Sequence, residues 1–91
     1  MNVFNFVAFQ DEPTHRIKYS YKSGAGVSAH AKFDTDRACI DAAEQYAINH
    51  NLKYPNKIVK VEVYKYLKDW RLEDEPIFRR NFKLKTIWQN S

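Results

Sequence analysis

The stretch Asp34–Leu52, DTDRACIDAAEQYAINHNL, has a clear helical pattern and decides the predicted fold. At about 100° per residue, its small and apolar residues gather on one side of a helix. The residues on that side are Asp36, Cys39, Ile40, Ala42, Ala43, Tyr46, Ala47 and His50. Asp34 is the predicted N-cap, because its carboxylate can accept hydrogen bonds from the first turn. The position before Pro55 disfavours helical geometry, so the helix should end near Asn51 or Leu52.

The rest of the chain is predicted to form a sheet that packs on this helix. Alanine dominates the buried side of the helix, so the strands must supply most of the core volume. Short segments rich in β-branched and aromatic residues predict the strands. They are Val3–Phe9, His15–Lys22, Val27–Phe33, Lys57–Leu67 and Arg79–Trp88. The order βββαββ predicts one α+β domain, residues 1–91, with a helix on one face of a mainly antiparallel sheet.

The alternation of apolar and polar residues also predicts how the strands pair. Ser23–Gly26 is the expected connection of the first hairpin, and an odd-length loop keeps the inward residues opposite one another. The inward pairs are then Tyr21 with Val27, Tyr19 with Ala29 and Ile17 with Ala31. The outward pairs are Arg16 with Lys32 and Lys18 with His30, which places like charges opposite each other. The last hairpin is expected to pair Val63 with Phe82, Val61 with Leu84, Glu62 with Lys83 and Lys60 with Lys85.

The charge of the chain favours an anionic partner. Fifteen Lys and Arg residues exceed eleven Asp and Glu residues, which gives a net charge of +4 and attraction to anions. No apolar run is long enough to span a bilayer and the N-terminus lacks a signal-peptide pattern, so we expect a cytoplasmic protein without membrane contact. The many Lys, Asn, Ile, Tyr and Phe residues are typical of AT-rich coding, which would suit a phage or a mobile element. The single cysteine, Cys39, is interpreted as a packed, inert thiol.

The sequence predicts no catalytic centre, cofactor or metal site. Cys39 and His50 share a helix side but lie about 16 Å apart along the axis, too far to act on one group. No histidine and cysteine spacing resembles a zinc site. The run Glu73–Glu75 is interpreted as a solvated loop, with a divalent-cation site as the alternative. The protein is therefore not expected to be an enzyme.

The uncovered sheet face is the predicted binding site for a nucleic-acid backbone or another polyanion. Cations that point outward from several strands can contact phosphates, and tyrosines between them can stack on unpaired bases. The candidate residues are Arg16, Lys18, Lys22, Lys32, Lys60, Tyr64, Tyr66, Lys83 and Lys85. Lysine outnumbers arginine among them, which favours backbone contact over base-specific recognition. A plain solvated sheet face, whose lysines discourage aggregation, is the alternative without function.

A protein-binding module is the competing functional hypothesis. Exposed aromatic and aliphatic residues are the anchors that protein interfaces use. The candidates are Trp70, Tyr64, Tyr66 and Ile87. Under this hypothesis the chain is a phage-type inhibitor or regulator of a host protein complex. Self-association into a homodimer through exposed strand surface is a further alternative.

Overall fold

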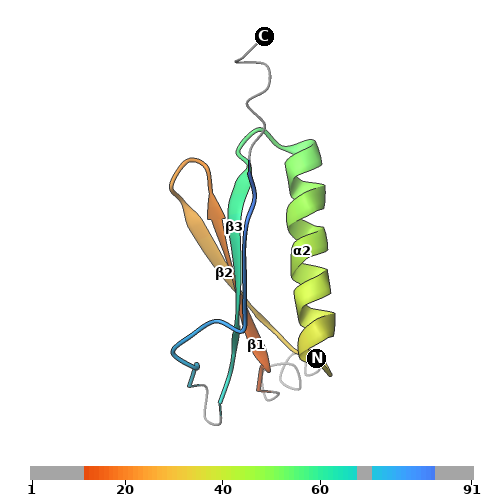
Figure 1. The fold of residues 1–91 in the computed structure, drawn as a ribbon, viewed down its shortest axis with the longest axis vertical. Helices are drawn as coiled ribbons and strands as arrows, with labels where there is room; N and C mark the ends of the chain where they lie inside the picture. Colours follow the sequence, from red (N-terminus) through yellow and green to blue (C-terminus); the bar gives the residue numbers. More distant parts are fainter. Residues whose placement is uncertain (1–11, 68–70, 84–91) are drawn as a thin grey trace, which may run out of the picture.

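The computed structural model describes residues 12–67 and 71–83 of the chain. Within this part, four antiparallel strands form a sheet and one helix packs on it (Figure 1). The elements are β1 (His15–Tyr21), β2 (Gly26–Ala31), α2 (Asp36–Lys53), β3 (Ile58–Lys65) and β4 (Phe78–Asn81). The strand order is β2-β1-β3-β4, and α2 packs on one face of the sheet against β3 and β1. The predicted α+β class is confirmed. The predicted strand Val3–Phe9 lies outside the described residues.

The helix begins later than predicted, and Thr35 rather than Asp34 is its N-cap. Thr35 has an extended backbone, and its Oγ1 accepts a hydrogen bond of 3.1 Å from the N–H of Ala38. A hydroxyl at this position satisfies a free N–H of the first turn as well as a carboxylate would. Asp36 is therefore the first helical residue, where its negative charge lies near the positive end of the helix dipole.

The restriction imposed by Pro55 ends the helix where the sequence predicts, within one residue. Tyr54 is extended, with φ −120° and ψ 145°, and its N–H still donates to the carbonyl oxygen of His50. The pyrrolidine ring of Pro55 disfavours helical geometry at the residue before it. α2 consequently stops at Lys53.

Small residues on one side of α2 let the helix approach the sheet closely. Cys39, Ala43 and Ala47 recur every four residues and are buried. The strands supply the larger core side chains, as the alanine-rich helix requires. These are Ile17, Tyr19, Ile58, Val61 and Val63. The core therefore lies between α2 and the two central strands, β1 and β3.

The first hairpin has an odd-length loop, but the predicted register is wrong by two residues. Tyr19 faces Val27, and outside the core Arg16 faces His30 while Lys18 faces Ser28. The predicted like-charge pairs of Arg16 with Lys32 and Lys18 with His30 therefore do not form. The turn decides the register, because the N–H of Gly24 donates to Tyr21 O and the N–H of Tyr21 donates to Ala25 O. Gly24 has φ 98°, which a three-residue hairpin loop requires at its last position.

A bulge in β3 changes which of its residues enter the core. Ser20 faces Lys60, whereas the next residue, Tyr21, faces Ile58, so Val59 has no partner on β1. Both Ile58 and Val61 are consequently buried, while Val59, which the alternation places in the core, is half-buried.

The last hairpin also has a different register from the predicted one. Val63 faces Phe78 and Glu62 faces Arg79, so the pairs of Val63 with Phe82 and Glu62 with Lys83 are wrong. Lys60 faces Asn81 rather than Lys85, and Val61 faces Arg80 rather than Leu84. The chain has already turned at a bridge between Tyr66 and Leu72. Between this bridge and the Val63–Phe78 pair, residues 73–77 oppose only residues 64–65, so the acidic run Glu73–Glu75 protrudes from the hairpin.

A buried polar network ties the start of β1 to the start of α2. His15 is buried, and its Nε2 lies 2.8 Å from Asp36 Oδ1. Its Nδ1 lies 2.7 Å from the hydroxyl of Thr14. That hydroxyl also accepts from the N–H of Phe33 and contacts the carbonyl oxygen of Ala31. Because backbone groups occupy Thr14 Oγ1, the network is interpreted as structural rather than catalytic.

Candidate polyanion-binding face

Alternation along the four strands places one set of polar residues on the sheet face opposite α2. We call this the outer face. It consists of Arg16, Lys18, Ser20, Ser28, His30, Lys60, Glu62, Tyr64, Arg79 and Asn81. Figure 1 shows α2 on only one side of the sheet, and no second layer of described elements covers the other side. Arg16 and Lys18 of β1, Lys60 of β3 and Arg79 of β4 therefore lie on one face.

A single carboxylate lies at the centre of the outer face. Glu62 is only 5% exposed although no described element covers it. Its Oε2 accepts a hydrogen bond of 3.1 Å from Arg79 Nε, and its Oε1 lies 3.8 Å from Lys60 Nζ. Lys18 faces it across β1. Two cations thus contact one anion and a third lies opposite it on the neighbouring strand, which leaves a positive excess at the centre of the face.

Arg16 adds a further uncompensated charge to the outer face. It lies between His30 of β2 and Tyr64 of β3 in the sheet. Its Nε is buried without a hydrogen-bond partner in the described ranges. A buried donor in this condition costs free energy, and the attached guanidinium charge adds to the positive potential of the face.

The two predicted stacking tyrosines are less accessible than the sequence suggests. Tyr64 and Tyr66 are both half-buried. The hydroxyl of Tyr66 lies 2.7 Å from His30 Nδ1, and the two rings are 5.8 Å apart and tilted by 44°. Tyr66 therefore reaches across the sheet from the end of β3 to β2. This contact anchors its ring, which favours a role in shaping the face over free stacking on a ligand.

The remaining predicted residues lie around the rim or outside the described residues. Lys22 is exposed in the β1–β2 turn, Lys32 is exposed after β2, and Lys83 is exposed after β4. The structure does not describe three of the predicted residues. These are Trp70, Lys85 and Ile87.

Three cations on the helix side of the molecule each lie beside a carboxylate of α2. Lys65 Nζ lies 3.4 Å from Asp36, and Arg80 lies 2.7 Å from Glu44. The exposed Arg37 lies 3.3 Å from Asp41, one helical turn away. Each of these three cations thus has a carboxylate partner, whereas Glu62 is the carboxylate partner of both Lys60 and Arg79 at the centre of the outer face. Among the described strand residues, the outer face therefore carries more cations than carboxylates.

Sequence reasoning missed a second feature, an aromatic groove beside the end of α2. The His50 ring lies near the rings of both Tyr46 and Tyr54, and Tyr21 of β1 stacks on it from the sheet. Tyr46, His50 and Tyr54 are four apart in the sequence, which places them on one side of a helix. This spacing is the signal that could have indicated one wall of the groove. The helical pattern instead suggested that Tyr46 and His50 belong to the core.

Two further findings concern metals and membranes. Within residues 12–67 and 71–83, no group of three or more His, Cys, Asp or Glu side chains is arranged to hold a metal ion. The described helix, α2, is not apolar enough to cross a bilayer.

Comparisons of the chain with protein-family models, with curated proteins and with solved structures found no significant match.

Proposed function

We propose that this chain is a non-enzymatic binding protein whose outer face holds a polyanion, and that the polyanion is a nucleic-acid backbone. The supporting observation is the unequal distribution of charge pairs. On the helix side Lys65, Arg80 and Arg37 each lie beside a carboxylate, whereas on the outer face Lys60 and Arg79 share Glu62, and Lys18 and Arg16 have no ion pair within the described residues. A phosphate backbone laid across the sheet would supply the missing negative charge and release its own counterions.

The role that follows is an accessory or inhibitory one in the cytoplasm. A small protein that covers phosphates occludes them from other proteins without any chemical step. Lysine-rich contacts of this kind select for charge and spacing rather than for base sequence.

Charge reversal on the two sides of the sheet tests the proposal. Lys18 is exposed on the outer face, and Arg37 is exposed on α2. Lys18→Glu should weaken binding of a fluorescent oligonucleotide at low salt by about three- to tenfold and reduce the slope of log K against log salt by about 1 to 2. Arg37→Glu makes the same change in net charge and should have little effect.

Equal losses for the two variants would mean that only net charge matters, and the outer face would then not be the site. Absence of any binding by the wild-type chain at low salt would remove the proposal altogether. Circular dichroism and thermal unfolding of both variants establish that the fold is retained.

A second candidate function is self-association through β2, and the exposure of that strand favours it. β2 is an edge strand, and its residues 26–30 are exposed, including Val27 at 48%. Natural edge strands are usually protected by charges, yet the chain has no Asp, Glu, Lys or Arg between Gly24 and Ala31. A second copy could therefore pair with β2 without charge repulsion.

The mass of the protein in solution tests this second candidate. Sedimentation should show a concentration-dependent dimer for the wild type, and Val27→Lys should abolish it by adding a charge at the edge. Leu52→Lys, which introduces the same charge at an exposed helix position, should leave the dimer intact. A monomer at all concentrations would exclude self-association.

A further inference from the structure

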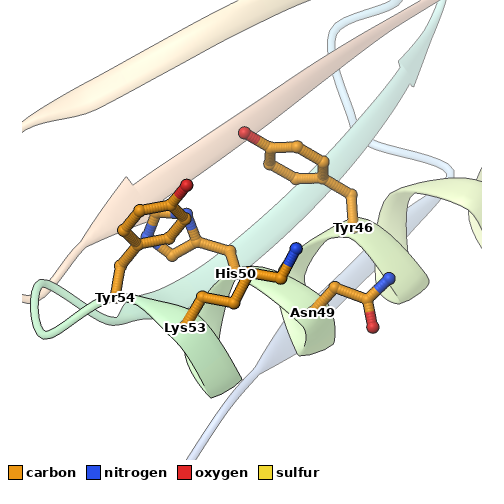
Figure 2. A pocket seen from close by; sticks show the side chains of 5 residues that line it. All are labelled: Tyr46, Asn49, His50, Lys53 and Tyr54. Carbon is orange, nitrogen blue, oxygen red and sulfur yellow. The ribbon is translucent and has the colours of Figure 1, made fainter.

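A groove of about 250 Å³ lies along the C-terminal half of α2, on the flank that faces the end of β1. Its lining residues are Tyr46, Asn49, His50, Lys53 and Tyr54. Figure 2 shows the ring of Tyr54 overlapping that of His50 and the ring of Tyr46 farther along the helix, with the Lys53 side chain extending toward the region between the two tyrosines. The groove is smaller than the pockets that hold whole cofactors, which usually exceed about 300 Å³, so it suits a single ring system.

His50 gives the groove a rigid floor. Its ring stacks on Tyr21 with centroids 5.3 Å apart and an angle of 20°, and the Tyr54 ring is 4.8 Å away. Its Nε2 lies 3.0 Å from the carbonyl oxygen of Asn56. A carbonyl oxygen only accepts hydrogen bonds, so Nε2 carries a proton, and the Nδ1 of a neutral imidazole is left as an acceptor.

The two tyrosines present more surface than packing alone requires. Tyr46 is 51% exposed and Tyr54 is 53% exposed, although the Tyr46 ring contacts Tyr19 and His50 and the Tyr54 ring contacts His50. The Tyr46 ring lies over Tyr19, with centroids 5.0 Å apart. These contacts hold the rings in place, while about half of the surface of each residue remains exposed. Preorganised aromatic surface of this kind favours stacking on a flat ligand.

The polar residues of the groove select for negative charge. Lys53 supplies an ammonium group, and no carboxylate lines the groove. Asn49 Oδ1 accepts a hydrogen bond of 3.0 Å from Gln45, so the Asn49 amide nitrogen remains as a donor. A ligand that fits must therefore combine a flat ring with an anionic group. A nucleobase attached to its phosphate has this combination.

The groove lies where a strand bound on the outer face would leave the sheet. Tyr21, which supports His50, is followed by the exposed Lys22, and the N–H of Lys22 donates to Lys57 O at 2.7 Å. From Lys18 to Lys22 the chain advances about 13 Å at roughly 3.3 Å per residue. Cations thus continue from the outer face, past the end of β1, to the groove.

We infer that the groove between Tyr46 and Tyr54 stacks one unpaired nucleobase while Lys53 contacts a neighbouring phosphate, so the bound polyanion is single-stranded nucleic acid. This inference rests on the proposed function and adds the class of polymer. A duplex keeps its bases stacked inside and cannot offer a ring to the groove. A protein partner that inserted an aromatic side chain is the competing occupant.

Binding of three polyanions, measured at one salt concentration, tests whether the groove stacks an unpaired nucleobase. They are single-stranded oligothymidylate, a DNA duplex of equal length and inorganic polyphosphate. The double variant Tyr46→Leu with Tyr54→Leu should weaken oligothymidylate binding about tenfold or more, because base–aromatic stacking is lost. Its affinity for polyphosphate and duplex should not change. The double Tyr→Phe variant keeps the rings and should bind as the wild type does. Leu52→Ala, an exposed change in the last turn of the same helix, is the matched control.

If the double leucine variant does not fold, an NMR titration of the wild-type protein with a nucleotide still tests the inference. Thymidine 5′-monophosphate should shift the NMR signals of the Tyr46 and Tyr54 ring protons, and inorganic phosphate should not. No shift with the nucleotide would overturn the inference.

The outcomes also distinguish the two proposals. If Lys18→Glu weakens binding of all three polyanions but the tyrosine variant weakens none, the outer face stands and the groove does not stack bases. Equal loss of all three polyanions with the tyrosine variant would likewise overturn the inference. If polyphosphate and both nucleic acids fail to bind the wild type, both proposals are wrong.

Discussion

The Nε atom of Arg79 lies 3.1 Å from Oε2 of Glu62, and this ion pair joins β4 to β3 at the centre of the outer face. Lys60 Nζ lies 3.8 Å from Oε1 of the same carboxylate, and Lys18 is the residue opposite Glu62 on β1. Glu62 therefore has two opposed effects. It stabilises the sheet by reducing repulsion among the cations, and it lowers the charge that the face can offer to a polyanion.

Neutralising Glu62 should strengthen polyanion binding at a cost in stability. Glu62→Gln adds one positive charge to the face and should raise affinity for a nucleic-acid backbone about threefold or more at low salt. Loss of the charged partner of Arg79 should lower the free energy of unfolding by about 1 kcal/mol. Binding titrations and urea unfolding measure the two effects.

Glu44→Gln is the matched control, because it makes the same charge change on the helix side, where Glu44 pairs with Arg80 at 2.7 Å. Equal tightening by both variants would contradict a localised binding face.

The contact between His15 and Asp36 should make stability depend on pH in the acid range. The hydrogen bond from His15 is the main cause that holds the pKa of Asp36 below its usual 3.8, and Lys65 adds to it. A carboxyl whose folded pKa is lowered contributes stability that is fully present above the unfolded value. This stability is lost as the pH falls through the folded value.

Asp36→Asn should therefore be less stable than the wild type at neutral pH, and the difference should shrink below about pH 3.8. Urea unfolding of both proteins at a series of pH values measures it. Asp41→Asn, at an exposed carboxylate on the same helix, is the control. A difference between wild type and Asp36→Asn that stayed constant down to the lowest pH would show that the two states share one Asp36 pKa.

Cys39 should be protected from thiol reagents in the folded protein. The side chain is fully buried between α2 and the sheet, and burial raises the pKa of its thiol to about 11. Thiolate is the reactive form, so alkylation by iodoacetamide at pH 8 should be slow in buffer and rapid in denaturing urea. Mass spectrometry follows the reaction over time. Comparable rates in the two conditions would mean that the helix does not cover Cys39.

Gly24 should resist replacement because of its backbone rather than its surroundings. Its φ is 98°, and an added Cβ would meet nothing within 4 Å. Gly24→Ala should lower the free energy of unfolding by about 1 kcal/mol, the cost of left-handed geometry for an L-residue.

Gly26→Ala is the matched control for this turn, since its Cβ would make an ordinary 3.4 Å contact with Tyr19 O and its φ is not positive. Thermal unfolding compares the two variants. A larger loss at Gly26 than at Gly24 would place the constraint in packing instead.

Some features of the fold were predictable because they depend on residues near one another in the chain. The helix followed from the repeat of Cys39, Ala43 and Ala47, and its end followed from Pro55. The predicted N-cap, Asp34, is wrong, because the adjacent Thr35 can also cap a helix. The hydroxyl of Thr35 is the one that reaches the N–H of Ala38.

Strand register was not predictable from alternation, which repeats every two residues. A shift of two leaves every side chain on the same face, so Tyr19 points into the core whether it faces Ala29 or Val27. The left-handed Gly24 and the protruding Glu73–Glu75 run decide the pairings instead. Alternation therefore identified the outer face correctly while assigning wrong neighbours within it.

The sequence by itself determined the helix, the class of fold and the sheet face on which Arg16, Lys18 and Lys60 lie. These depend on local periodicity and on backbone restrictions that act over a few residues. Only the tertiary structure decided that Glu62 meets Arg79, that Tyr66 reaches His30, and that Tyr46 and Tyr54 frame a groove beside Tyr21. The reason is that each of these relationships depends on which strands are neighbours and on how their registers align, and turns and packing fix both.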